Sequence, residues 1–142
     1  MQDFVAMSST SPTRTSTTAR PSVLLVEDVP FVRDTIAQML RLLGYDCLSA
    51  ADAVCALQIA SDHAVRVDAL VSDITMPDAD GRLLVPSIRR YRPGLPALLI
   101  SGYADGTMDA AACGAGFLPK PFSPGELREA LDAILPRSVA AA

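Results

Sequence analysis

Polar residues stand directly after several short apolar runs of the kind that form buried strands. They are Glu27, Asp28, Asp73, Ser101 and Lys120. Asp73 ends the apolar run 69–72 and precedes a loop that turns through Pro77 and Gly81. In open parallel sheets, ligands bind outside the carboxyl ends of the strands. We therefore predict that these side chains meet at one edge of a sheet.

Together these residues have the chemistry to accept a phosphoryl group. A carboxylate such as that of Asp73 can attack phosphorus and form an aspartyl phosphate. Three converging carboxylates repel one another, and a Mg²⁺ ion, which prefers oxygen ligands, relieves that repulsion. The ion and Lys120 can neutralise phosphoryl oxygens, and the Ser101 hydroxyl can donate a hydrogen bond to one of them. The pattern predicts a Mg²⁺-dependent acceptor site at Asp73.

Each residue alone also has an ordinary structural interpretation. An acid after a strand is often a solvated loop residue or a helix cap, and a single lysine is often a surface charge. Placement at separate strand ends favours the functional interpretation for this set. We interpret Asp78, Asp80 and Asp105 as loop or capping acids and His63 as a lone surface histidine. The three cysteines lack metal-ligand spacing and are interpreted as small core residues of a protein in a reducing compartment.

The elements that would position the site alternate between strand and helix. Apolar runs predict strands at 22–26, 45–50, 69–73, 96–100 and 117–118, and helical spacing predicts helices at 30–43, 52–60, 82–91, 104–114 and 124–135. This order predicts an α/β fold with a doubly wound, five-stranded parallel sheet of flavodoxin-like order 2-1-3-4-5.

Local signals refine several of these helices. Ser123, Pro124 and Glu126 form a capping box with proline at the first helical position, the clearest helix start in the chain. Pro86 lies inside the third helix and predicts a late start or a kink. The segment 104–114 contains Gly106 and few large apolar residues, which predicts a short or poorly formed fourth helix.

Composition and charge limit the classes of function. The chain has 142 residues, half of them hydrophobic, and a formal net charge of −4. No basic stripe is available to follow phosphates, so we expect no nucleic-acid binding. No apolar run reaches the ~18 residues that span a bilayer, so we expect no membrane partner and a cytoplasmic location. We expect a disordered Ser/Thr-rich leader at 1–20, one domain at 21–137 and a disordered tail at 138–142.

The motifs of the chain resemble those of the receiver domain of two-component response regulators. They are Val23-Leu24-Leu25-Val26-Glu27-Asp28, Ser72-Asp73-Ile74-Thr75-Met76-Pro77 with Asp80-Gly81, Ile100-Ser101-Gly102, and Lys120-Pro121-Phe122. Together they are highly specific, and the match covers residues 21–136. The segments around Ser101 and Lys120 are most similar to receivers of hybrid sensor histidine kinases.

The resemblance implies a role for each site residue. Asp73 would be the phosphoacceptor, and Asp28 and Asp73 would bind Mg²⁺ directly. The backbone carbonyl of Thr75 would complete the protein ligands, with Glu27 acting mainly through water. Ser101 and Lys120 would bind phosphoryl oxygens. The donor would be a sensor histidine kinase or a histidine phosphotransfer protein, and phosphorylation would switch binding of a downstream protein.

The resemblance also implies a switch, and the chain departs from the family in one segment. Phe117 occupies the position of the family's switch aromatic, which moves when the hydroxyl of Ser101 is drawn inward. The Lys-Pro bond at 120–121 is typically cis in this family. The segment between Ser101 and Lys120 is shorter than usual. Tyr103, next to Gly102, would overhang the phosphoryl group and slow self-dephosphorylation.

Other functions remain as alternatives at this point. A haloacid-dehalogenase-type phosphatase also uses a strand-end aspartate, but its second aspartate is replaced here by Thr75, so we expect no turnover of external substrates. A pseudo-receiver would act as a docking module without phosphorylation. A true phosphoacceptor with no output domain could be a partner-binding switch, a relay or a phosphate sink.

Overall fold

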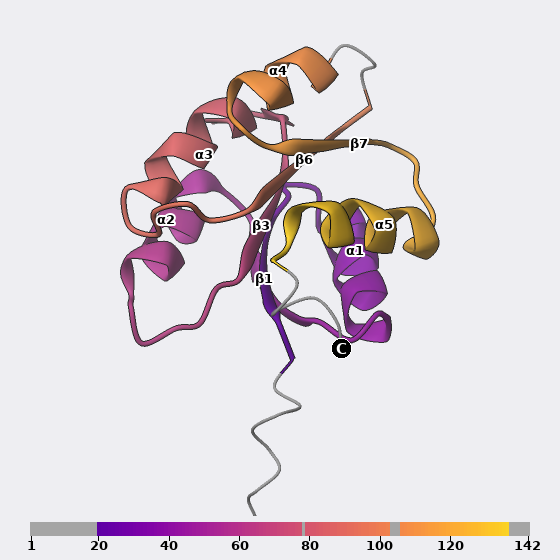
Figure 1. The fold of residues 1–142 in the computed structure, drawn as a ribbon, viewed down its shortest axis with the longest axis horizontal. Helices are drawn as coiled ribbons and strands as arrows, with labels where there is room; N and C mark the ends of the chain where they lie inside the picture. The colour runs from indigo at the N-terminus through magenta and orange to yellow at the C-terminus, as the bar shows by residue number, and fades with distance from the viewer. Residues whose placement is uncertain (1–19, 78, 103–105, 137–142) are drawn as a thin grey trace, which may run out of the picture.

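The computed structural model describes residues 20–77, 79–102 and 106–136. Five parallel strands form one sheet in the order β2-β1-β3-β6-β7, the predicted flavodoxin-like order (Figure 1). These strands are β1 (Ser22–Val26), β2 (Asp46–Ala50), β3 (Ala69–Asp73), β6 (Ala97–Ser101) and β7 (Gly116–Pro119). The helices are α1 (Pro30–Leu42), α2 (Ala53–Ser61), α3 (Gly81–Arg89), α4 (Gly106–Ala112) and α5 (Pro124–Ile134). The predicted fold class is therefore confirmed.

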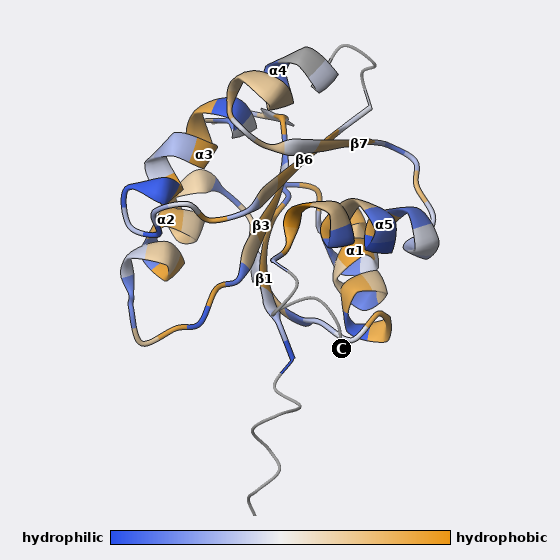
Figure 2. Ribbon diagram, viewed as in Figure 1, coloured by the Kyte–Doolittle hydropathy of each residue, from blue (hydrophilic) through white to orange (hydrophobic). Residues whose placement is uncertain are grey.

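Helices cover both faces of the sheet, because successive strand residues point to opposite sides. Val23 and Leu25 pack with α1 and α5, whereas Leu24 and Val26 pack with α2, α3 and α4. Figure 1 shows the sheet between these two helix layers, and Figure 2 shows its central strands as the most continuous hydrophobic feature. Such two-sided burial is typical of parallel sheets, and within the sheet it leaves polar side chains to the strand ends.

Short sequence signals determine several helix ends. At α5, the Ser123 hydroxyl accepts the Glu126 N–H while the Glu126 carboxylate accepts the Ser123 N–H, which is the predicted capping box. After α1, Gly44 has φ +101°, a conformation that favours glycine, and the next N–H, of Tyr45, bonds to the Leu40 carbonyl. Asp52 caps α2 by accepting the Cys55 N–H.

Pro86 predicted a late start or a kink in α3, and of these the late start is wrong. The helix begins at Gly81, with Asp80 as its N-cap, and runs through Pro86 to Arg89. Proline lacks the N–H that would bond to the carbonyl four residues earlier, which here belongs to Arg82. The thiol of Cys113 donates to that carbonyl instead, at 3.3 Å. A partner 31 residues away thus replaces the missing helical bond.

Two short elements follow the ends of strands β3 and β6. The segment after Asp73 forms a small antiparallel pair, β4 (Thr75–Met76) with β5 (Ala79–Asp80), which the sequence did not predict. The fourth helix, α4, has 7 residues and is short, as predicted. Among the described residues, no helix is both long and apolar enough to cross a membrane.

Several sequence predictions fall outside the described residues. These are the tail, all of the leader except Arg20, and the interpretations of Asp78, Tyr103 and Asp105. Arg20 itself donates hydrogen bonds to the carbonyls of Arg41, Gly44 and Tyr45 at the end of α1. His63 is exposed, with Nε2 3.1 Å from the Tyr91 carbonyl oxygen.

Candidate functional site

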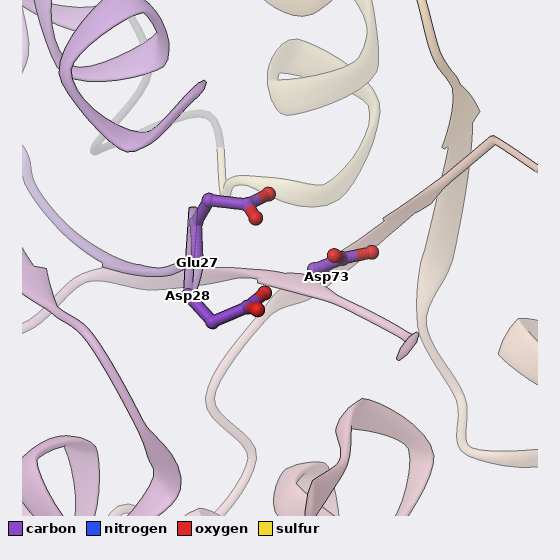
Figure 3. A group of neighbouring side chains, drawn as sticks. All are labelled: Glu27, Asp28 and Asp73. Atoms are coloured by element: carbon purple, nitrogen blue, oxygen red, sulfur yellow. The ribbon is translucent and has the colours of Figure 1, made fainter. Parts of the chain in front are cut away.

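Three carboxylates meet where the neighbouring strands β1 and β3 end. Glu27 and Asp28 directly follow β1, and Asp73 is the last residue of β3. One oxygen from each lies within 4.8 Å of the others. Figure 3 shows the side chains of Glu27 and Asp28 both directed to the side on which Asp73 lies. Glu27 is fully buried and Asp73 is 7% exposed, so this is a largely desolvated cluster of acids.

Lys120 brings a positive charge to this cluster from the far edge of the sheet. It follows β7, and its Nζ lies 2.9 Å from Glu27 Oε1 and 3.5 Å from Asp73 Oδ2. Its backbone is fixed by an N–H bond of 2.8 Å to the Ser101 carbonyl, and the Lys120–Pro121 bond is cis, as the resemblance implied. Lys120 is thus shared between two acids and lies closer to Glu27.

Both carboxylate oxygens of Glu27 have protein partners. Oε1 pairs with Lys120, and Oε2 accepts the Val29 N–H at 3.2 Å. Burial of an unpaired carboxylate would be strongly unfavourable, so these two contacts explain how Glu27 is accommodated with no exposed surface. In this arrangement Glu27 anchors Lys120 and the start of α1.

The pKa of Asp73 is raised above its ordinary value. Burial is the main cause, and the nearby charge of Glu27 adds to it. The ammonium of Lys120 and a hydrogen bond from the Thr75 backbone act in the opposite direction. The penalty of burial therefore outweighs the opposing effect of Lys120 and Thr75 on the pKa of Asp73.

The remaining predicted residues lie in or directly after strands β4, β6 and β7. Ser101 is buried at the end of β6 and lies in register beside Pro119 of β7. Phe117 is half-buried in β7, opposite Leu99, and packs against the core on the α4 side. Thr75 is exposed at the start of β4. Gly102 is exposed after β6.

Sequence reasoning did not identify how closely Gly81 packs behind the phosphoacceptor candidate. The Gly81 N–H bonds to the Ile74 carbonyl at 2.8 Å. A Cβ atom at position 81 would lie 2.2 Å from the backbone oxygen of Asp73. Only glycine fits there, and the Asp80-Gly81 pair in the sequence was the available signal.

The donor set fits a hard divalent cation. Its side-chain ligands are all carboxylate oxygens, which Mg²⁺ prefers, and they surround one point between two strands. Within the described part of the chain, the Asp28 carboxylate has no hydrogen bond or ion pair to another protein group, which leaves it available as a ligand. Three carboxylates and one ammonium leave two negative charges, the charge that a divalent ion would balance.

Comparison with known proteins identifies the family. The model of the response regulator receiver domain matches residues 23–132. The chain belongs to the response regulator receiver domain family. Receiver domains are signalling switches of two-component systems rather than turnover enzymes, so the family assignment agrees with the expected class of function.

The relatives include receivers of hybrid kinases, as the motifs indicated. The sensor kinase CckA of Brucella abortus is 40% identical over 105 residues, which cover 72% of this chain and 11% of the kinase. A crystal structure of the receiver domain of the hybrid histidine kinase CckA has a TM-score of 0.69 at 39% identity, covering 81% of this chain and 99% of that one.

A further similar structure is a complex with Mg²⁺-BeF. The response regulator TrrA of Thermotoga maritima, in complex with Mg²⁺-BeF, has a TM-score of 0.71 at 25% identity and covers 81% of this receiver and 99% of that chain. The receiver spans only 11% to 50% of the length of the first curated relatives it matches.

Proposed function

We propose that this receiver accepts a phosphoryl group on Asp73 in a Mg²⁺-dependent reaction and thereby switches the binding of a protein partner in the cytoplasm. The observation that carries the proposal is the convergence of the Glu27, Asp28 and Asp73 carboxylates within 4.8 Å, with Lys120 in contact with two of them. A mere surface cluster of acids would be solvated, whereas this one is largely buried.

The transfer uses the carboxylate of Asp73 as the nucleophile. A bond forms between one Asp73 oxygen and phosphorus while the nitrogen–phosphorus bond of a phosphohistidine donor breaks. The donor imidazole keeps the electron pair and takes up a proton from water. Lys120 and the Ser101 hydroxyl are the groups we assign to the phosphoryl oxygens, where charge develops in the transition state.

The residues assigned to the metal are Asp28, Asp73 and the backbone carbonyl of Thr75, with Glu27 contributing mainly through water. The two protein contacts of the Glu27 carboxylate support this indirect role. When bound, Mg²⁺ supplies positive charge to the phosphoryl oxygens. Asp73 would serve both as a metal ligand and as the acceptor of the phosphoryl group.

An apolar groove supports a helical protein as the donor. It encloses about 230 Å³ between α1 and the segment after β7, and its lining includes Phe31, Met39, Phe122 and Lys120. Phe31 is 80% exposed at the edge of this groove, so its ring is available to contact a partner. Lys120 belongs both to the groove and to the acidic site, so a helix in the groove would present its histidine beside Asp73.

The central experiment uses a small phosphodonor. The protein is incubated with acetyl phosphate and Mg²⁺, with and without a chelator, and its intact mass is measured. One phosphoryl adduct is expected with Mg²⁺, and none with the chelator or in Asp73→Asn. Asp80→Asn is the matched control, because that carboxylate caps α3 and pairs with Arg82 instead. No adduct on a folded wild-type protein would contradict the proposal and favour a phosphorylation-independent docking module.

A second experiment tests the donor surface. Phe31→Ala should slow transfer from a phosphorylated histidine phosphotransfer protein or kinase and leave the reaction with acetyl phosphate unchanged. Leu42→Ala is the control, because it removes an equally exposed apolar side chain from the other end of α1. Equal transfer rates for both variants would remove the groove from the proposal. The lifetime of the adduct then separates a phosphate sink or relay from a sustained switch.

A further inference from the structure

Arg33, in the first turn of α1, contacts the backbone of the residues that carry two of the site's three carboxylates. Its Nη1 donates to the Glu27 carbonyl oxygen at 2.8 Å and lies 3.5 Å from the Asp28 carbonyl oxygen. The side chain is half-buried. Arg33 lies outside the motifs that identify the site in the sequence.

The junction that Arg33 spans has no side-chain cap, although the Val29 N–H bonds to the Glu27 carboxylate and the Glu27 N–H bonds to the Ala50 carbonyl. Its N-cap is Val29, which offers no side-chain cap, and Pro30 follows at the first helical position. The first turn of α1 contains no acid. An aspartate near a helix N-terminus is attracted by the partial positive charge of that helix end. Asp28 is such an aspartate, yet its carboxylate is directed toward Asp73 (Figure 3).

We propose that Arg33 is a positioning residue for the metal site. By holding the Glu27 and Asp28 carbonyls, it fixes the backbone from which the Asp28 carboxylate reaches the cation. This inference rests on the proposed function, because it assigns a role toward the same Mg²⁺ site. Arg33 acts only through the residues it holds and makes no contact with the phosphoryl group in the proposal.

Two effects of Arg33 on metal binding have opposite signs. Its positive charge opposes a nearby cation, so removing the charge alone would tighten Mg²⁺ binding. Its hydrogen bonds orient a ligand, and loss of such an orienting partner typically weakens metal binding by about 10- to 100-fold. Arg33 is partly open to solvent, where charge repulsion is screened. Loss of orientation should therefore dominate.

The experiment measures binding directly, by electron paramagnetic resonance of Mn²⁺ and its displacement by Mg²⁺. Arg33→Gln should weaken binding by about 10-fold. Arg33→Lys keeps the charge and one donor and should recover part of the loss. Arg92→Gln is the matched control, because Arg92 also donates to backbone carbonyls, those of Ala60, Asp62 and Val65. It should bind the metal as the wild type does.

A second readout separates positioning from a general loss of structure. At saturating Mg²⁺, Arg33→Gln should react with acetyl phosphate at nearly the wild-type rate, because Asp73, Ser101 and Lys120 are intact. Unchanged or tighter metal binding in Arg33→Gln would overturn the inference, as would an equal loss in Arg92→Gln. Absence of binding by the wild type would instead contradict the proposed Mg²⁺ site itself.

Discussion

The close approach of Gly81 to Asp73 makes Gly81→Ala a sharp test of how the nucleophile is held. The added Cβ would lie 2.2 Å from the Asp73 carbonyl oxygen and 3.0 Å from its carbonyl carbon. Atoms in ordinary contact are roughly 3.5 Å apart, so the Asp73 backbone must retreat by about 1 Å. The atoms in the way are backbone, and no side-chain rotation can relieve the clash.

The displacement should affect both stability and chemistry. Overpacking of this kind typically costs about 1–3 kcal/mol of unfolding free energy. A misplacement of about 1 Å at a reacting group can reduce the rate by about 100-fold. We therefore expect Gly81→Ala to unfold at lower denaturant concentration. We also expect it to accept phosphate from acetyl phosphate about 100-fold more slowly than the wild type.

Gly125→Ala is the control, because it makes the same chemical change in the first turn of α5. There the added Cβ would meet only the Ser123 hydroxyl oxygen, at 3.8 Å. Replacing glycine by alanine without strain stabilises a protein by about 0.4–1 kcal/mol, through the unfolded chain. Urea unfolding and the rate of adduct formation by mass spectrometry measure the two effects. If Gly81→Ala matches Gly125→Ala in both, the argument from close packing is refuted.

Further predictions concern the core, the α3–α4 contact and pH. Leu127→Ala should lower the free energy of unfolding, measured in urea, by about 2–5 kcal/mol, because the side chain is fully buried. Leu42→Ala removes a side chain that is 84% exposed and should lower it by less than about 0.5 kcal/mol. Cys113→Ala should lower the free energy of unfolding by about 1 kcal/mol, because it leaves the Arg82 carbonyl without its donor. Cys113→Ser retains a donor and should recover part of that loss. Equal stabilities of the wild type and Cys113→Ala would contradict this role of the thiol. Thermal unfolding in chelator should show Asp73→Asn more stable than the wild type at pH 7. The raised pKa means that the ionised carboxylate destabilises the folded state above that pKa, and the difference should shrink as the pH falls toward the unfolded value of 3.8. A stability difference between Asp73→Asn and the wild type that grows as the pH falls would contradict a raised pKa of Asp73.

Much of the fold was predictable because most elements are specified by residues close together in the sequence. The five strand runs, the capping box of α5 and the glycine after α1 all act over a few residues, and the structure contains each of them. Strand order followed from the α/β pattern, and β2 and β7 lie at the edges of the sheet. The convergence of Glu27, Asp28 and Asp73 followed from the same topology.

Contacts between distant segments were not predictable. Pro86 predicted a late start or a kink in α3, because nothing in its neighbourhood indicates that Cys113 supplies the missing donor. The strands β4 and β5 have two residues each, too few for any periodic signal. The contact of Arg33 with the Glu27 carbonyl depends on the geometry of the turn between them. Each of these arrangements is decided by tertiary packing.

The shared use of Lys120 helps to explain why the pKa of Asp73 is raised although an ammonium lies beside it. Buried carboxylates normally have partners that lower their pKa, yet that of Asp73 is raised despite Lys120. Lys120 is closer to Glu27, at 2.9 Å, than to Asp73, at 3.5 Å, so one ammonium serves two acids. A phosphoryl group on Asp73 would compete with Glu27 for this ammonium. Asp28 and Asp73 would hold a divalent cation whose charge compensates the acids, which makes metal binding and phosphoryl acceptance interdependent in the proposed function.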